Sequence, residues 1–318
     1  MSGTSESAVP SVRSFEQIRD KAARIVSEKG KPRAAVVVPL DIHTFRAVAR
    51  ADHEGLIEPY MIGDERLARQ TALQNGIDVG SVNFVNISEP EAAVQTAIRM
   101  AVGEELDILI NGRVPAVELL KQVLNRENSY LPEGSVLSHV AVMKPSLYDK
   151  LLLLSDAAVN MEPALQTKLA IVDNAVRVAD VIGISMPRVA IIAAVEVISP
   201  QMPVTIDAAI IAKMADRKQI VGAYVDGPLS FDVAVDVAAA RAKGIEDSLV
   251  AGQADILIAP DIATANGVYR AMTLFGNAAM GGMIVGGKVP LVLNSRSDTT
   301  DNRFNSIVLA ALAVASDR

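Results

Sequence analysis

Short apolar runs rich in β-branched residues alternate with amphipathic stretches along almost all of this chain. A short run that is apolar throughout fits a strand buried on both faces, whereas apolar residues spaced three and four apart fit a helix with one buried face. This alternation predicts an α/β fold with mostly parallel sheets and helices on both faces. The strand-like runs are 34–38, 81–85, 107–110, 135–142, 150–154, 188–195, 220–225, 255–258 and 289–293, and the helical patterns include 15–28, 91–102, 163–182, 233–243 and 304–314.

The length of 318 residues favours two domains over a single core. Two segments have the composition of linkers: 126–138, which is polar and contains proline and glycine, and 281–289, which is rich in glycine. If both are hinges, the first domain is discontinuous and comprises 1–133 plus 288–318. The second domain is then 134–287, and ligands are expected at the carboxyl ends of the strands.

Composition excludes several classes of protein. The chain has no cysteine, so disulfides, thiolate metal sites and cysteine nucleophiles are excluded. Its three histidines form no HxxxH or HExxH pattern, and no GxSxG motif is present, so neither zinc chemistry nor a serine hydrolase is expected. A net charge of −7 argues against nucleic acid as a partner. The first residues lack the apolar core of a secretory signal and no apolar run approaches the ~20 residues of a membrane helix, so we expect a cytoplasmic protein whose first ten or so residues are disordered.

The segment VDGPLSFDVAVD, 225–236, joins an apolar run to a helical pattern. Asp226 either stabilises the strand-to-helix turn or faces a cleft from the end of the strand. Asp232 and Asp236 are four residues apart and would share a face if one helix carried both. Such a pair holds a divalent cation in metal-dependent dehydrogenases of similar architecture, although it is also common on solvated helix faces.

The segment 259–297 gathers the largest number of candidate binding residues. Asp261 closes a strand, and Asn266 and Arg270 follow in a helical pattern, where they either support a loop or contact a phosphorylated ligand. Several glycines follow, among them Gly281 and Gly286, and they match neither a Walker motif nor GxGxxG. They are compatible with a hinge or with close approach of a nucleotide tail.

The run LNSRSDTTD, 293–301, places serines, an arginine and two aspartates between a strand and a helix. An arginine beside a helix N-terminus makes an anion site. The alternative is a capping segment, with Asp298, Thr299 or Thr300 as N-cap and Arg296 in a salt bridge.

Four ordered blocks resemble the phosphate acetyltransferase and phosphate butyryltransferase family. They are GSVLSHVAV with YDKLLLLSDAAVNMEPALQTKLAIVDNAV, then VDGPLSFDVAVD, then SLVAGQADILIAPDI, and finally PLVLNSRSD. The resemblance covers about 107–298, and its first block is closest to the butyryl branch. It implies two α/β domains of the isocitrate/isopropylmalate dehydrogenase kind, with the site in the inter-domain cleft, and a homodimer or larger assembly.

The reaction that the resemblance implies is acyl-CoA plus phosphate giving acyl phosphate plus CoA, with coenzyme A as a substrate and no cofactor or metal. Ser295 and Arg296 match the Ser-Arg pair of the family by position. The catalytic base is an aspartate just beyond that pair, and both Asp298 and Asp301 lie in this window. A carboxylate there would accept the thiol proton, while the serine and arginine would stabilise the oxyanion.

The residues expected to bind substrate or CoA are Asp226, Asp261, Asn266, Arg270, Gly281, Gly286 and Lys121. The chain departs from the family at Asn111, where butyryl-type enzymes tend to have lysine, and near it only Arg113 and Lys121 are basic. Three functions are therefore weighed. They are a phosphate acyltransferase, a metal- and nicotinamide-dependent decarboxylating dehydrogenase that uses Asp232 and Asp236, and a non-catalytic acyl-CoA-binding or regulatory protein.

Overall fold

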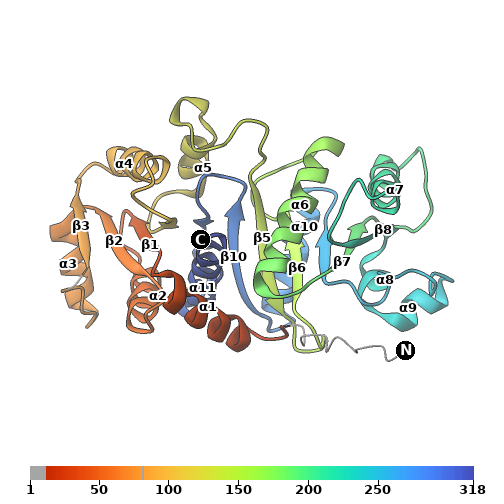
Figure 1. Cartoon of the computed structure of the whole chain (residues 1–318), viewed down its shortest axis with the longest axis horizontal. Helices are drawn as coiled ribbons and strands as arrows, with labels where there is room; N and C mark the ends of the chain where they lie inside the picture. Colours follow the sequence, from red (N-terminus) through yellow and green to blue (C-terminus); the bar gives the residue numbers. More distant parts are fainter. Residues whose placement is uncertain (1–11, 81) are drawn as a thin grey trace, which may run out of the picture.

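The computed structural model describes residues 12–80 and 82–318, and the segment expected to be disordered lies outside these residues. The chain forms one sheet of 11 strands in the order β3-β2-β1-β4-β11-β10-β5-β6-β9-β7-β8, which runs across the whole molecule (Figure 1). The strands are β1 (Arg33–Val37), β2 (Glu58–Gly63), β3 (Asn83–Asn86), β4 (Ile108–Asn111), β5 (Ser138–Lys144), β6 (Leu152–Ser155), β7 (Arg188–Ile192), β8 (Tyr224–Leu229), β9 (Ile256–Ile258), β10 (Ala279–Val285) and β11 (Leu291–Val292).

Most neighbouring strands are parallel, as the sequence predicts. The strands β3, β2, β1, β4 and β11 are parallel to one another, and so are β6, β9, β7 and β8. Between these two sets, β10 is antiparallel to β11 and to β5, and β5 is antiparallel to β6. The two parallel sets therefore run in opposite directions, and they meet at β11, β10 and β5 in the middle of the sheet.

Helices cover both faces of the sheet and divide the core into three clusters. On one face a continuous cluster includes residues of α1, α2, α3, α6, α7 and α11. On the other face α4 and α5 cover the first set of strands, while α8, α9 and α10 cover the second. The helices are α1 (Phe15–Lys29), α2 (Ile42–His53), α3 (Glu65–Gln74), α4 (Pro90–Val102), α5 (Ala116–Leu124), α6 (Leu165–Ile182), α7 (Pro203–Asp216), α8 (Phe231–Val235), α9 (Val237–Ala242), α10 (Ile262–Leu274) and α11 (Thr300–Asp317), and η1 (Arg126–Asn128) is a short 3-10 turn.

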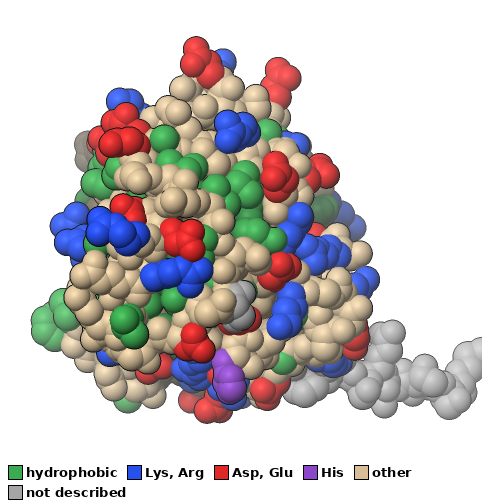
Figure 2. All heavy atoms as spheres, turned by 90° about the vertical axis from the view of Figure 1, so that its left-hand side faces the viewer, with side chains coloured by type: hydrophobic (Ala, Val, Ile, Leu, Met, Phe, Trp, Pro, Cys, Tyr) green, Lys and Arg blue, Asp and Glu red, His purple; other side chains and the backbone are tan. Residues whose placement is uncertain are grey.

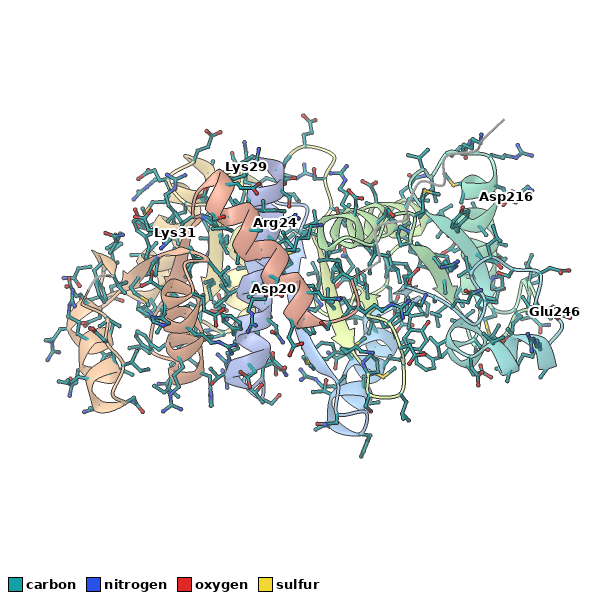
Figure 3. The ribbon with its side chains drawn as sticks, turned by 60° about the horizontal axis from the view of Figure 1, so that its bottom comes forward. Asp20, Arg24, Lys29, Lys31, Asp216 and Glu246 are labelled. Atoms are coloured by element: carbon teal, nitrogen blue, oxygen red, sulfur yellow. The ribbon has the colours of Figure 1, made fainter. Side chains whose placement is uncertain are left out.

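The C-terminal helix α11 lies at the centre of the fold. It packs against β4, β11 and β10 as well as α1, α2 and α6, so it covers the edge of the first set of strands and the middle of the sheet. Figure 3 shows α1 lying across α11, with Asp20 and Arg24 on α1. The end of the molecule that carries β3 presents basic and acidic side chains interspersed with scattered apolar ones (Figure 2). Within 12–80 and 82–318, no helix is both long and apolar enough to cross a membrane.

The structure corrects three expectations about elements. First, 281–289 is not a loop throughout, because Gly281 lies inside β10. Second, β8 does not end at Asp226 but continues to Leu229. Third, 233–243 is not one helix, because α8 ends before Asp236 and this residue caps α9. The strands β2 and β10 were not expected.

The two segments with linker composition contact each other. The buried side chain of Tyr130 donates a hydrogen bond of 2.6 Å from its Oη to the carbonyl oxygen of Val289. The N–H of Lys288 donates to the carbonyl oxygen of Tyr130 at 2.9 Å. Gly287 lies so close to the Tyr130 ring that an added Cβ would come within 2.4 Å of it. Both chain crossings between the two sets of strands are thus fixed by one buried tyrosine.

Candidate active site

A cleft of about 360 Å³ lies on the face of the sheet where the α4–α5 cluster and the α8–α10 cluster separate. One wall is α5 and the other is α10. Strand register places His139 beside the buried α4–α5 cluster, because it stands in one row with Leu109, Leu291 and Ile284 across β4, β11, β10 and β5. The carboxyl ends of β4, β11 and β6 all reach this cleft.

The helix α10 presents three polar side chains to the cleft. Asp261 caps its first turn by accepting a hydrogen bond of 2.7 Å from the N–H of Thr264. Asn266, Tyr269 and Arg270 are spaced three and four apart on the helix and therefore share the face that lines the cleft. The Asn266 amide donates to the carbonyl oxygen of Ala157 at 3.3 Å, which connects α10 to the end of β6. Asp261 thus fixes the start of the helix, while Asn266 and Arg270, two of the residues expected to bind substrate or CoA, line the cleft.

Arg270 meets the loop that follows β11. Its Nη2 donates a hydrogen bond of 3.2 Å to Ser295 Oγ, and its Nη1 donates one of 3.4 Å to Ser297 Oγ. The two serine hydroxyls are themselves 3.1 Å apart. Arg296 also lines the cleft, and its side chain is exposed. Two guanidinium groups and two hydroxyls therefore gather at one end of the cleft and make it attractive to an anion.

Asp298 belongs to the same loop, and its side chain is buried. Its Oδ2 accepts a hydrogen bond of 2.7 Å from the N–H of Ser295, and the Asp298 N–H donates back to the Ser295 carbonyl oxygen at 3.1 Å. The residue is 7% exposed. Burial raises the pKa of the Asp298 carboxyl above its ordinary value, and the hydrogen bond from Ser295 and the charges of Arg270 and Arg303 offset only part of this effect.

Arg303 holds the loop from below. It is 3% exposed, and it donates hydrogen bonds to the carbonyl oxygens of Ser295 at 3.2 Å and Asp298 at 3.3 Å. Its Nη1 also donates to Asp41 Oδ1 at 2.6 Å, so its buried charge is paired. This arginine from α11 fixes the backbone that carries Ser295, and sequence reasoning missed it.

The two candidate bases occupy different environments. Asp301 lies in the first turn of α11, which Thr299 caps, and its side chain is 82% exposed. It pairs with Arg50 Nη1 of α2 at 3.1 Å. Neither aspartate is among the residues that line the cleft, but Asp298 bonds the backbone of the lining residue Ser295 and Asp301 does not.

His139 is a cleft residue that sequence reasoning did not select. It lies near the start of β5, is 6% exposed, and meets the Tyr269 ring edge-to-face with the centroids 6.2 Å apart. Its Nδ1 has no hydrogen-bond partner in the described chain. Burial lowers the pKa of its imidazole, and the Arg270 charge adds to this, while Asp156 acts in the opposite direction. The ring is neutral at pH 7 as a result. Because His139 lies between two separate core clusters, no helical or strand periodicity in the sequence marks it as a cleft residue.

Besides Asp261, which caps α10, four predicted binding residues do not line the cleft. Asp226 lies in the edge strand β8 and accepts hydrogen bonds from the Gly227 N–H and the Ser248 hydroxyl. It therefore stabilises the local backbone, the alternative to facing a cleft. Lys121 is exposed on α5. The last two are Gly281, which packs against the backbone of α11, and Gly286, which has φ +94 beside the carbonyl oxygen of Val136.

The pair Asp232 and Asp236 does not share a helix face, because the helix is interrupted between them. Asp232 contacts the Ser230 hydroxyl and Lys243, and Asp236 caps α9 by accepting from the N–H of Ala238. No group of three or more His, Asp or Glu residues suited to a metal occurs in the parts of the chain that the structure describes. The alternative of a metal site built from these two aspartates on one helix face is thus contradicted.

Asn111 lines the cleft at the end of β4, but its side-chain amide bonds the backbone of Val114. Its amide donates to the carbonyl oxygen of Val114 at 3.0 Å and accepts from the N–H of Val114 at 3.2 Å. The neighbouring Arg113 side chain is exposed. Asn111 therefore shapes the turn that leads into α5.

Comparison with known proteins identifies the family. A family model described as Phosphate acetyl/butaryl transferase matches residues 91–311. The chain belongs to this family. The phosphate butyryltransferase of Clostridium acetobutylicum is 40% identical over 305 residues, which cover 96% of this chain and 99% of that protein. The phosphate acetyltransferase of Thermotoga maritima is 37% identical over 293 residues, covering 92% of this chain and 98% of that protein.

A solved structure of the phosphotransacylase type has the same fold. The crystal structure of a branched-chain phosphotransacylase from Enterococcus faecalis superposes with a TM-score of 0.77 and is 32% identical, covering 89% of this chain and 99% of that one. The α/β fold with one large, mostly parallel sheet is therefore shared with phosphotransacylases of the phosphate acetyl/butyryltransferase family.

Proposed function

We propose that this protein is a phosphate acyltransferase that interconverts acyl-CoA plus phosphate with acyl phosphate plus CoA. The observation that carries the proposal is the contact of Arg270 with Ser295 in a cleft lined by the loop after β11, which also holds the buried Asp298. Membership of the phosphate acetyl/butyryltransferase family supports it, as does 40% identity to a phosphate butyryltransferase. Coenzyme A is a substrate in this reaction.

In the direction that forms acyl-CoA, Asp298 accepts the proton of the CoA thiol. Its Oδ2 is bonded to the Ser295 N–H, and Oδ1 has no hydrogen-bond partner among the described residues. A base with a raised pKa holds the proton more readily at neutral pH, and such a group contributes roughly 10²–10⁴-fold to a rate. The thiolate sulfur then attacks the carbonyl carbon of the acyl phosphate, and the bond from that carbon to the phosphate oxygen breaks.

The carbonyl oxygen carries negative charge during this step, and the departing phosphate carries more. The Ser295 hydroxyl and the guanidinium groups of Arg270 and Arg296 are the donors at that end of the cleft. One such donor is typically worth about 3–4 kcal/mol of transition-state stabilisation. Because Arg270 and Arg303 fix the loop before substrate binds, little reorganisation is needed during the reaction.

We also propose that the chain has two lobes of the isocitrate/isopropylmalate dehydrogenase kind, 1–133 with 288–318 and 134–287. The sheet order supports this division, because β3, β2, β1, β4 and β11 come from the first segments and the other strands from the second. The continuous cluster beneath α11 joins the two lobes. A homodimer and a cytoplasmic location stay predictions.

The deciding experiment is phosphate-dependent release of CoA from acetyl-CoA and butyryl-CoA, followed with a thiol reagent in the presence and absence of chelator. The chain has no cysteine and so adds no thiol background. Release that requires phosphate and resists chelator is the expected result. Folded protein that binds acyl-CoA without releasing CoA would favour the non-catalytic alternative.

A further inference from the structure

The two sides of the cleft differ in chemistry. The side formed by α10 and the loop after β11 carries Arg270, Ser295 and Arg296. The opposite side is apolar and consists of Val114, Val117 and Leu120, in and just before α5, together with Leu293 at the end of β11. Between them the floor includes Ala157 and Ala158, whose small side chains leave space above the end of β6.

The apolar side is fixed in place but not covered. Val114, Leu120 and Leu293 pack against the core cluster under α4 and α5, so the wall is anchored to the core. Val117 faces the cleft and is 74% exposed. An exposed β-branched side chain among the residues that line a concave site has apolar area available for an apolar ligand group.

We propose that this wall, Val114, Val117, Leu120 and Leu293, binds the alkyl chain of the acyl group and makes the site prefer acyl groups of about four carbons over acetyl. The inference rests on the proposed function. With the acyl carbonyl beside Ser295 and Arg270, a longer alkyl chain would extend within the same cleft toward Val117 and Leu120. An acetyl group has only a methyl and offers much less apolar surface to the wall.

The proposal predicts a measurable selectivity. Each methylene bound in an apolar pocket changes kcat/KM by about 10–200-fold. The bound alkyl chain also displaces water from the cleft, which strengthens the electrostatic contribution of Arg270. Butyryl-CoA is therefore expected to have a higher kcat/KM than propionyl-CoA, and propionyl-CoA a higher one than acetyl-CoA.

The test is the ratio of kcat/KM for butyryl-CoA to that for acetyl-CoA, with saturating phosphate, in the Val117→Thr and Leu120→Ala variants. Val117→Thr keeps the shape of the side chain and places a hydroxyl in the path of the alkyl chain, so the ratio should fall several-fold. Leu120→Ala removes part of the wall, and the ratio should fall about tenfold. Val221→Thr is the matched control, because Val221 is 73% exposed and lies outside the residues that line the cleft.

The outcomes separate the proposal from its alternatives. A lower ratio in both variants, with the control unchanged, supports the acyl wall. If kcat/KM for both thioesters falls by the same factor, their ratio stays constant. The wall then contacts the part of CoA that the two thioesters share, and this result overturns the inference but not the proposed function. If wild-type protein turns over none of the thioesters, the proposed function fails and the inference fails with it.

Discussion

Arg270 and Ser295 are 25 positions apart in the chain, yet Arg270 Nη2 lies 3.2 Å from Ser295 Oγ. Arg270 comes from α10, which packs on the second set of strands, whereas Ser295 follows β11 in the first set. Their hydrogen bond therefore connects the two halves of the sheet at the end of the cleft that is rich in donors. A side chain that both positions Ser295 and supplies positive charge should influence binding and chemistry together.

Replacing Arg270 with glutamine is expected to reduce kcat by about 10²–10³-fold, because one charged donor to the developing oxyanion and phosphate is lost. Steady-state kinetics with acyl-CoA and phosphate measures the effect. Arg177→Gln is the control, since Arg177 is an exposed arginine that pairs with Asp173 on α6. Normal kinetics in Arg270→Gln would show that the Arg270 side chain of α10 takes no part in the mechanism.

Asp298→Asn is expected to reduce kcat by about 10²–10⁴-fold through loss of the base, while the amide oxygen still accepts the Ser295 N–H. Because burial raises the pKa of Asp298, the wild-type rate should rise with pH through a pKa above the ordinary value of 3.8. That rise should be absent from the residual activity of the variant, as a pH–rate profile can show.

The same substitution makes a prediction about stability. A buried carboxyl with a raised pKa favours the folded state when protonated, and this contribution is lost as pH rises through the folded-state pKa. At neutral pH the Asp298→Asn variant, whose amide carries no charge, should therefore unfold at the same temperature as wild type or a higher one. A large drop in Tm would mean that the charge of Asp298 has a structural role instead.

Asp301→Asn should behave nearly like wild type, because Asp301 is exposed and its partner is Arg50 on α2. An exposed pair of this kind contributes about 0–1 kcal/mol to stability. Kinetics of Asp298→Asn and Asp301→Asn measured side by side decide between the two aspartates that the sequence left open. Inactivity of Asp301→Asn in folded protein would reverse the assignment.

The sequence predicted the α/β class because buried strands leave a strong local signal. The run 34–38 became β1 and the run 188–195 contains β7. It failed where tertiary context overrides local pattern. Gly281 and its neighbours suggested a turn, but this glycine lies in β10 because the close approach of α11 leaves no space for a side chain.

The candidate site was predictable only in part, for a related reason. Ser295 and Arg270 were selected from residue type and family resemblance, and both line the cleft. His139 and Arg303 were missed because their positions depend on strand order and on α11 passing under the loop, which no local pattern encodes. Asp226 was selected because it follows an apolar run, but β8 is an edge strand on the far side of the sheet from β4 and β11.

Two glycine substitutions test the packing of α11 beneath the site. A Cβ at position 281 would lie 2.9 Å from the Asn305 carbonyl carbon and 2.9 Å from the Ser306 nitrogen, both backbone atoms of α11. Since backbone cannot rotate away, Gly281→Ala should destabilise the protein by about 1–3 kcal/mol. Gly267→Ala is the matched comparison with space for the new side chain, because Gly267 is inside α10 and an added Cβ meets no atom within 4 Å.

In Gly267→Ala, alanine restricts the unfolded chain and favours the helix, so this variant should gain about 0.4–1 kcal/mol. Urea unfolding followed by circular dichroism measures both changes. The helix α11 carries Arg303, which holds the Ser295 loop, so Gly281→Ala should lower activity as well as stability. A Gly281→Ala variant that unfolds like wild type would show that α11 can shift away from β10 at little cost, and the Ser295 loop would then be less rigidly held than these contacts imply.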